Sequence, residues 1–209
     1  MKYFIRTTLE RQLDNSYSQI EYELLIDKEH NARKSFIEQL EYLATLNEDL
    51  VVLEDDLILC KDFKNRIEKI ILEHNTEVIN FFYHPSKYFK SRYTYFFIWN
   101  QCVYYPKEIL KKLSVKMREL YTKNLNMPHD ELEGQALSLL GLKTYLPRPC
   151  LVQHLDTSTL IQNKCLGNRR TPYFIDYLDE LNIVYDEAYK YKKELTELMQ
   201  SKFNNNKRR

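Results

Sequence analysis

The segment at residues 51–59 constrains the fold more than any other, because a short apolar run is interrupted there by consecutive acids. Val-Val-Leu at 51–53 precedes Glu54, Asp55 and Asp56, and Leu-Ile-Leu follows at 57–59. A short apolar run rich in β-branched residues is typical of a buried strand, and ligands bind at the carboxyl ends of parallel strands. We therefore expect the three acids to face a ligand.

Three adjacent carboxylates repel one another, and a carboxylate buried without a partner is costly. A divalent ion, Mg²⁺ or Mn²⁺, would hold them together, because it prefers hard oxygen ligands and also offsets phosphate charge. The motif therefore predicts a metal-borne diphosphate at this edge of the sheet. The alternative is a solvated acidic turn after a strand.

Strand-like runs at residues 2–8 and 22–26, and a helical pattern that Asn31 caps, precede the acidic motif. The apolar residues of that helix share one face: Phe36, Leu40, Leu43 and Ala44. The order βαβα followed by a third strand predicts an α/β fold with a mostly parallel, doubly wound sheet. The strand that carries the acids is then expected near the centre of the sheet.

Further strands are predicted at residues 78–82, 95–98 and 102–105, with shorter ones at 144–146 and 150–152. Helices are expected after Asp62, from Pro106, and from about residue 130 to a C-terminal cap at Gly141. Helical spacing returns from Asp176. We expect one α/β domain over residues 1–175 and a C-terminal helical extension with a basic tail over 176–209.

Composition limits the classes of partner. The 209 residues carry 31 Lys and Arg against 30 Asp and Glu, a net charge of +1, so no overall basic field indicates nucleic acid. The four cysteines show no CxxC spacing, and we expect reduced thiols in a cytoplasmic protein with no signal peptide or membrane span. Only three glycines occur, which excludes a P-loop and a GxGxxG motif. Nucleotide phosphates would have to be held by metal and side chains.

Bases and aromatic rings alternate over residues 83–93 without helical or strand periodicity. The stretch is a surface loop or an acceptor-binding loop in which rings stack on a sugar or a base. Trp99, Asn100 and Gln101 follow, and they offer an apolar platform beside two amides, although a tryptophan at the edge of the core is equally common. The residues with which we expect the acceptor to be bound are Lys87, Lys90, Arg92, Tyr93, Trp99, Asn100 and Gln101.

Three separated signals together resemble one family. They are Glu54-Asp55-Asp56 after a strand, the pair Asp130 and Glu131 at a helix start, and the segment 151–154 (Leu-Val-Gln-His) followed by hydroxyl residues. This combination resembles a small glycosyltransferase with the nucleotide-diphospho-sugar fold called GT-A, whose acidic motif is written ExD or EDD. The stretches at 80–82, 100–104, 151–154 and 169–171 look like those of phage-encoded glycosyltransferases. The resemblance covers roughly residues 1–175.

The resemblance implies roles for individual residues. Asp56 would be the main ligand of Mn²⁺ or Mg²⁺ and His154 would reach the same ion or the diphosphate, unless it is a structural histidine. Glu54 and Asp55 would assist through the nucleotide ribose or metal-bound waters. The nucleotide pocket and diphosphate clamp would be lined by Arg6, Thr7, Asp27, Asn31, Arg33, Arg169 and Arg170, although the last two can also be a surface pair.

The expected reaction moves a sugar from a nucleotide-diphosphate donor, with UDP as the expected nucleotide, to an acceptor hydroxyl. Asp130 would be the general base of an inverting reaction; the alternative is that it only caps its helix. Glu131 is adjacent, and without a carboxylate opposite the sugar the reaction would be retaining. A hydroxymethylated base in phage DNA is the expected acceptor, contacted by the 83–93 loop and the tail at 207–209. The alternatives are a surface polysaccharide or lipid-linked glycan, and a non-catalytic nucleic-acid-binding module.

Overall fold

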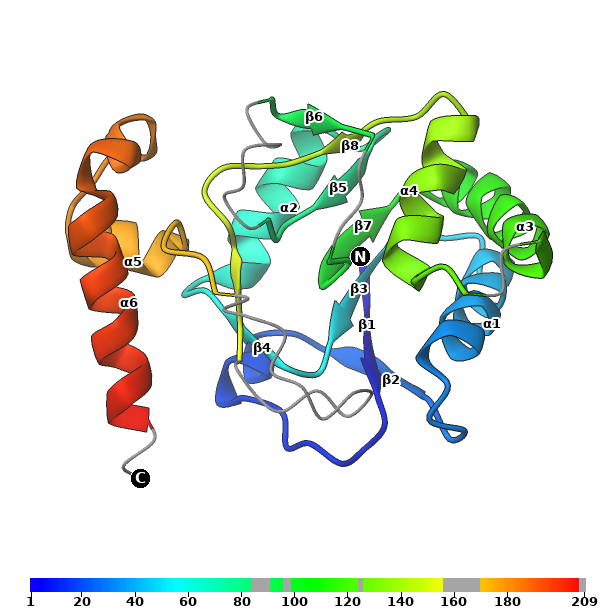
Figure 1. Ribbon diagram of the computed structural model, residues 1–209, viewed down its shortest axis with the longest axis horizontal. Coiled ribbons are helices and arrows are strands. Elements are labelled where there is room, and N and C mark those ends of the chain that lie inside the picture. The colour runs from blue at the N-terminus through cyan, green and yellow to red at the C-terminus, as the bar shows by residue number, and fades with distance from the viewer. Residues whose placement is uncertain (84–90, 96–98, 124–125, 156–169, 207–209) are drawn as a thin grey trace.

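The computed structural model describes residues 1–83, 91–95, 99–123, 126–155 and 170–206. The expectations for Lys87, Lys90, Arg169 and the basic tail at 207–209 therefore lie outside the described residues. Within them the chain forms a mixed α/β fold, in which helices cover both faces of a central sheet (Figure 1). This agrees with the fold class expected from the order of elements.

The sheet has seven strands within the described residues, in the order β2-β1-β3-β7-β5-β8-β6. Their bounds are β1 Lys2–Thr7, β2 Tyr22–Ile26, β3 Leu50–Glu54, β5 Val78–Asn80, β6 Tyr93–Thr94, β7 Cys102–Tyr105 and β8 Thr144–Tyr145. A separate antiparallel pair joins β4 Leu57–Leu59 to β9 Val152–His154. The strands expected at 2–8, 22–26 and 102–105 are confirmed, and β3 lies inside the sheet, as expected.

Five of these seven strands run in one direction, while β6 and β7 run against them. The sheet is thus mostly parallel in direction but mixed in pairing, since β7 is antiparallel to both of its neighbours, β3 and β5. The reversal has a simple cause. The chain leaves β5 and enters β7 at the same edge of the sheet, and the described part of the connection holds the short edge strand β6 but no crossover helix, so β7 runs back.

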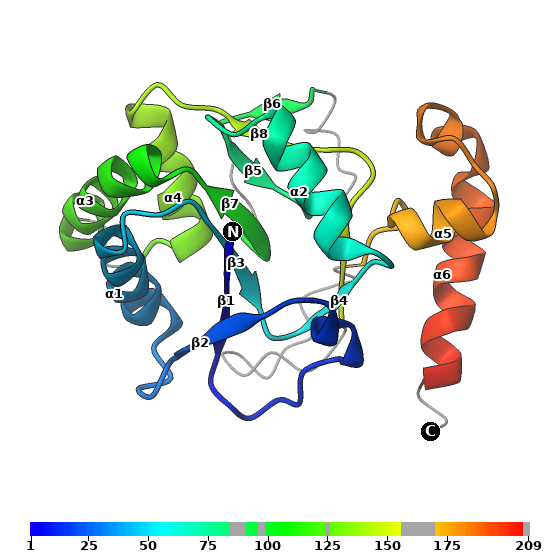
Figure 2. The ribbon, with the colours of Figure 1, turned by 180° about the vertical axis from the view of Figure 1, so that it is seen from behind.

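Helices α1 Ala32–Thr45, α3 Lys107–Lys123 and α4 His129–Leu139 cover one face of the sheet, and α2 Phe63–Glu73 covers the other (Figure 2). The 3₁₀ helix η1 Asn15–Gln19 joins β1 to β2. Asn31 caps α1 as expected, because its side-chain oxygen accepts a hydrogen bond from Lys34 N at 3.1 Å. Asp62 occupies the N-cap position of α2, but its side chain makes no capping hydrogen bond and its φ is 55°.

Alternation along the strands divides the core into two clusters. Tyr3 and Ile5 of β1 pack with α2, whereas Phe4 between them packs with α1 and α3. In β3, Val51 and Leu53 face the first cluster, and Leu50 and Val52 face the second. Because both faces are buried, a slip of one residue would move every side chain to the wrong face, which fixes the register of the strands that carry the site.

Three expected elements differ from the structure. The strand expected at 150–152 lies two residues later, as β9, because Cys150 instead bridges Phe174 in the region of Pro147 and Pro149. The described part of the expected 95–98 strand, Tyr95, lies in a bend after β6. The helical pattern from Asp176 breaks into α5 Ile175–Glu180, η2 Tyr185–Tyr191 and α6 Lys192–Asn206, with Asn182 at a φ of 52° between the first two.

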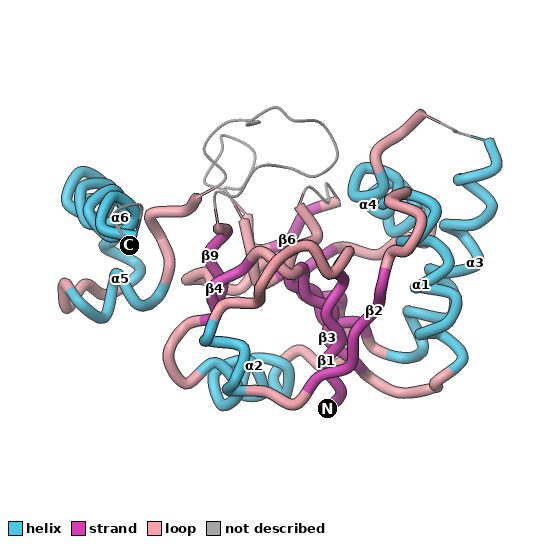
Figure 3. The backbone as a smooth tube through the Cα atoms, turned by 90° about the horizontal axis from the view of Figure 1, so that it is seen from below, coloured by secondary structure: helices cyan, strands magenta, loops and turns pink. Residues whose placement is uncertain are grey.

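The C-terminal elements α5, η2 and α6 lie beyond α2, on the side of the sheet away from α1 and α3 (Figure 3). Arg66 Nη2 on α2 donates to Asp179 Oδ2 at 2.8 Å, and the hydroxyls of Tyr83 and Tyr185 are 2.6 Å apart. Leu195 of α6 joins the core cluster that contains α2. The division of the chain at residue 175 stays a prediction. Among the described residues, every helix is too short or too polar to cross a lipid bilayer.

Candidate functional site

The carboxyl ends of β1, β2 and β3 meet at one edge of the sheet, and the acidic motif leaves the sheet there. Arg6 pairs in register with Glu54, and Thr7 with Ile26. The backbone of Asp56 is fixed from the far side, because Leu155 N donates to its carbonyl oxygen at 2.7 Å. The acids therefore lie at the carboxyl end of β3, as expected, and the structure places them between the main sheet and the β4–β9 pair.

Each of the three acids lies against a cationic side chain or a histidine. Arg11 Nη1 is 2.9 Å from Asp55 Oδ1 and 2.8 Å from Asp56 Oδ2, so one nitrogen bridges the two carboxylates. Arg6 Nη1 is 2.9 Å from Glu54 Oε1. His154 Nε2 is 3.3 Å from the same Asp56 oxygen that Arg11 contacts. The structure thus brings His154 to the acidic motif, as the resemblance implies.

Buried polar atoms without a hydrogen bond concentrate around this edge. In the described part of the chain they include Nε and Nη1 of Arg6, Oγ1 of Thr8, Oε1 of Gln101 and both ring nitrogens of His154. Arg6 Nη1 is close to Glu54 but is not aligned for a hydrogen bond. Native proteins leave few buried polar groups unsatisfied, and those that remain often mark a position for water, an ion or a ligand. Their convergence identifies this edge as the candidate site.

Burial at this edge shifts the pKa values of several ionisable side chains. Burial raises the pKa of Glu54 to about 7, against the lowering effect of Arg6. Burial and the charge of Asp56 raise the pKa of Tyr17 well above its usual range, and its hydroxyl donates to the carbonyl oxygen of Glu54. Behind the site, burial together with Arg6 and Arg33 lowers the pKa of His129 to about 3.

The residues expected to line a nucleotide pocket divide into two groups. Thr7 and Asp27 lie at the ends of β1 and β2, joined by a 2.8 Å hydrogen bond from Asp27 N to Thr7 O. Asp27 Oδ1 also accepts from the backbone nitrogens of Glu29 and Asn31, at 3.2 and 3.3 Å. Asn31 itself is used as the cap of α1. Arg33 points to the helix layer, where its guanidinium lies 4.8 Å from the centre of the Tyr121 ring.

Asp130 at the start of α4 anchors the segment that enters β7. Its Oδ2 accepts from Trp99 N at 3.1 Å, and its Oδ1 accepts from Glu131 N at 3.0 Å. Trp99 has a φ of 65°, and Asn80 Nδ2 donates to its carbonyl oxygen at 3.2 Å. A non-glycine residue in this conformation needs such external support. Glu131 is exposed and lies beside Asp130.

The segment 99–101 lies beside the acidic motif because β7 pairs with β3. Glu54 N donates to Gln101 O at 2.9 Å. Asn100 and Gln101 are both buried. The structure therefore brings together four separated parts of the sequence: the acids at 54–56, the segment Trp99–Gln101, Asp130 and His154.

Glu133 is a buried polar residue that sequence reasoning missed. Its side chain is fully buried and accepts from Tyr105 OH at 2.6 Å and from Asn100 Nδ2 at 3.2 Å. Burial raises its pKa to about 8. A signal was present, since position 133 lies three and four residues before Ala136 and Leu137 and therefore shares the buried stripe of the helix. Arg11 was also missed as a partner of the acids, because no local pattern distinguishes it.

Two expected acceptor residues lie away from the acids. Arg92 precedes β6 and Tyr93 belongs to it, and β6 is separated from β3 by β7, β5 and β8. At the usual strand spacing this is roughly 19 Å. Tyr93 OH donates to Glu77 Oε2 at 3.3 Å, and Arg92 Nη1 donates to Tyr145 OH at 3.4 Å.

Arg170, expected at the diphosphate, is held near β9 through its neighbour Thr171. Thr171 N donates to Gln153 Oε1 at 2.9 Å, and Gln153 Nε2 donates to Thr171 O at 2.7 Å. Since Gln153 precedes His154 in β9, the main chain at residue 170 runs beside the strand that carries this histidine.

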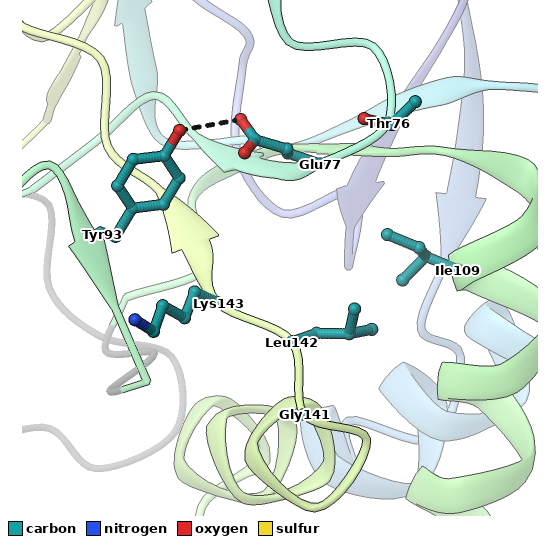
Figure 4. A pocket seen from close by; sticks show the side chains of 7 residues that line it. All are labelled: Thr76, Glu77, Tyr93, Ile109, Gly141, Leu142 and Lys143. Carbon is teal, nitrogen blue, oxygen red and sulfur yellow. Dashed lines mark hydrogen bonds between the residues drawn. The ribbon is translucent and has the colours of Figure 1, made fainter.

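A separate pocket of about 250 Å³ lies at the opposite, amino edge of the sheet (Figure 4). Thr76 and Glu77 precede β5 and Lys143 precedes β8, so the pocket is lined by residues that lead into the parallel strands. Glu77 there is already engaged, since His74 Nδ1 is 2.7 Å from its Oε2. The residues predicted for catalysis, metal and nucleotide binding do not line this pocket.

The donors at the acidic edge fit a divalent ion only in part. The described residues form no cluster of three or more His, Cys, Asp or Glu groups arranged for a metal. Asp56 and His154 nevertheless place an oxygen and an unsatisfied nitrogen side by side. Mg²⁺ is often held by one or two carboxylates together with substrate phosphates, so an incomplete protein site fits an ion that arrives with a diphosphate.

Comparison with known proteins adds no family. No protein-family model matches the chain, and no curated protein does. Among solved structures, the crystal structure of A197 from STIV aligns with a TM-score of 0.48 and 13% sequence identity, covering 74% of this chain and 86% of that chain.

Proposed function

We propose that this protein is a metal-dependent glycosyltransferase that takes a sugar from a nucleotide diphosphate. The observation that carries the proposal is the convergence of Glu54, Asp55 and Asp56 with the unsatisfied buried nitrogens of His154 at the carboxyl edge of a mostly parallel sheet. Phosphate ligands in such sheets bind at this edge. The GT-A resemblance supplies the class of reaction.

The roles follow from position. Asp56 and His154 would hold Mn²⁺ or Mg²⁺, which when bound offsets the charge of the diphosphate leaving group. Arg6 lies beneath the acids with its Nε unsatisfied, and Thr7 and Asp27 end the two strands beside it. These residues are proposed to bind the nucleotide, with the Arg6 guanidinium as the fixed positive charge. Arg170 and Arg169 are proposed to contact the diphosphate from the β9 side.

Asp130 is proposed as the general base that removes the proton from the acceptor hydroxyl. It lies on the helix layer and holds Trp99 N, so its carboxylate is fixed at the start of the segment that runs beside Glu54. A carboxylate fixed at the main chain of Trp99 suits a general base that meets the acceptor hydroxyl. Glu131, adjacent and exposed, is the alternative base.

The proposed acceptor is a hydroxymethylated base in DNA, and a glycan is the alternative. The DNA proposal rests on the resemblance to phage-encoded enzymes and on the bases and rings at 83–93. The net charge of +1 favours a glycan. Arg92, the described base of that stretch, is exposed at the edge of the sheet, where it can contact a phosphate backbone.

A transfer panel tests the proposal. Radiolabelled nucleotide sugars are incubated with Mn²⁺ and with hydroxymethylated DNA, unmodified DNA or glycans, and label in the acceptor is counted. We expect label in hydroxymethylated DNA and none when the ion is chelated. Label in glycans alone would reject the DNA acceptor, and binding to DNA without any nucleotide-sugar binding would indicate the non-catalytic alternative. Glu77→Gln changes a carboxylate at the amino edge and should transfer label like the unsubstituted protein.

A further inference from the structure

Arg11 lies where an ion shared by the acids would have to bind. Its Nη1 is 2.9 Å from Asp55 Oδ1 and 2.8 Å from Asp56 Oδ2, and its side chain is only 17% exposed. A Mg²⁺ ion sits about 2.0–2.1 Å from each oxygen ligand, so it cannot share the space between these oxygens with a guanidinium nitrogen. The arginine and the ion must therefore exclude one another at Asp55 and Asp56.

The second observation is His154, which is 2% exposed and has no hydrogen bond at either ring nitrogen among the described residues. Its Nε2 is directed at Asp56 Oδ2, the oxygen that Arg11 also contacts. Asp56 is thus approached by two groups, one of which has an unused donor or acceptor. Removing Arg11 from Asp56 would leave an oxygen and an imidazole nitrogen together, which is a usable pair of metal ligands.

We propose that Arg11 exchanges with the divalent ion: it bridges Asp55 and Asp56 in the free protein, and the arriving metal–diphosphate displaces it onto the diphosphate. This inference rests on the proposed function and assigns Arg11 a binding role that the sequence did not indicate. Arg11 belongs to the connection at 8–14 between β1 and η1, and this connection starts at the same edge as the proposed nucleotide pocket. Once released from the acids, the long arginine side chain can reach the phosphate oxygens of a nucleotide bound at this edge. Its guanidinium can then form a bidentate pair with them.

The exchange explains how the acids are kept compatible before the substrate binds. Without a cation, Asp55 and Asp56 would be buried together at 4% and 8% exposure. The arginine offsets their repulsion in the free protein, and the ion takes over this role in the complex. Because Arg11 then gains phosphate contacts, binding of the diphosphate and binding of the ion favour each other, whereas the ion alone has to compete with the arginine.

Two titrations with opposite expected signs test the exchange. Mn²⁺ alone should bind about tenfold tighter to Arg11→Gln than to the unsubstituted protein. The electron paramagnetic resonance signal of the free ion measures this binding. Inorganic pyrophosphate in saturating Mn²⁺, followed by calorimetry, should bind about tenfold more weakly. Arg66→Gln removes another arginine–aspartate pair, 2.8 Å long and on α2, and should change neither affinity. Circular dichroism and the midpoint of thermal unfolding show whether each variant is folded.

The outcomes separate the inference from the proposed function. Mn²⁺ affinity that is unchanged in Arg11→Gln contradicts exclusion. Tighter Mn²⁺ binding with unchanged pyrophosphate affinity contradicts the transfer to the diphosphate and leaves Arg11 as a structural bridge. If the unsubstituted protein binds no pyrophosphate with Mn²⁺, the proposed function fails, and the transfer step fails with it. The Mn²⁺ titration still decides the exclusion. Should Arg11→Gln not fold, Arg11→Lys, which keeps the charge but not the fork, should show smaller changes of the same signs.

Discussion

The two edges of the sheet each bring a histidine against a carboxylate, but the two pairs differ in the number of hydrogen bonds and ring contacts that they make. At the amino edge, His74 Nδ1 is 2.7 Å from Glu77 Oε2, the ring stacks on Tyr145 at 3.8 Å, and Tyr93 OH donates to the same carboxylate. At the carboxyl edge, His154 is 3.3 Å from Asp56, and within the described part of the chain neither ring nitrogen has a hydrogen bond. A completed network stabilises the fold, whereas an incomplete buried one has capacity left for a ligand.

The comparison also shows why the pocket in the structure is not the best guide to function. In the hollow at the amino edge, Glu77, Tyr93 and Lys143 each already have a partner. The carboxyl edge holds three acids, and the opposing charge is supplied by Arg6 and Arg11 from the strand and loop beside them. Unsatisfied buried polar atoms, rather than empty volume, distinguish the two edges. The following predictions test that distinction.

The largest expected effect is on turnover. Asp130→Asn can keep the hydrogen bond from Trp99 N through its single amide oxygen, while it loses the one from Glu131 N, and it cannot take a proton from the acceptor. Loss of a general base typically lowers the rate by about 10²–10⁴-fold. We expect this loss in a transfer assay, with nucleotide-sugar affinity unchanged. Turnover like that of the unsubstituted protein would reassign the role to Glu131, or dismiss it, and Glu131→Gln is the paired variant.

Binding should respond next. Asp56→Asn removes one charged oxygen beside His154 and should weaken Mn²⁺-dependent affinity for a nucleotide diphosphate by about 10²-fold, with the fold retained. Calorimetry with and without Mn²⁺ measures this. Glu77→Gln makes the same kind of change at the amino edge and should leave the affinity unchanged. Equal losses in both variants would show that the two edges do not differ as we infer.

A pH-dependent stability effect is expected at Glu133. Its pKa rises from an ordinary 4.5 to about 8 in the folded protein, so the folded state binds a proton that the unfolded state releases between these values. The stabilisation is present in full below about pH 4.5 and is lost as the pH rises through about 8. Across this window Glu133 should contribute a fall of about 2–4 kcal/mol in the free energy of unfolding.

Glu133→Gln should remove this contribution, since an amide does not titrate and still accepts from Tyr105 OH. Urea unfolding at several pH values compares the two proteins. A pH profile that is the same in both would mean that Glu133 is not protonated in the folded state. Glu131→Gln, on the exposed side of the same helix, is the control and should leave the profile unchanged.

The smallest effect is expected at His74. His74→Ala removes the stacked ring and the partner of Glu77, and should lower the free energy of unfolding by about 1–2 kcal/mol. Because its network is complete and remote from the acids, nucleotide affinity should not change. A loss of affinity comparable to that of Asp56→Asn would contradict the assignment of the site to the carboxyl edge.

The sequence predicted what local patterns encode. The first two strands, the α1 helix with its Asn31 cap and the acids at a strand end were all visible as periodicity, capping and charge. His154 was placed near Asp56 through a family pattern, and the structure brings the two together. Assignment of metal, donor and base to these residues stays a prediction.

The rest depended on contacts between segments that no local pattern links. The reversal of β7 follows from where the chain re-enters the sheet, and the β9 shift from pairing with β4. Arg11 is one arginine among many until the structure places it between Asp55 and Asp56. Glu133 resembles a surface acid by type, and only its fixed partners Tyr105 and Asn100 make its burial tolerable.

The reversed strand β7 has a consequence for how proteins with this sheet can vary. The chain leaves β5 after Asn80, contributes the edge strand β6 and reaches β7 at Cys102, and the two ends of this connection are joined at their base, because Phe81 N donates to Cys102 O at 2.9 Å. Closing a longer loop between fixed ends adds little free-energy cost. The part of this connection before Trp99 can therefore be lengthened or shortened in evolution, while Trp99–Gln101, which contact Asp130 and Glu54, keep β3 and its acids in position. Variation between related proteins can then concentrate in this one connection and leave the acidic edge unchanged.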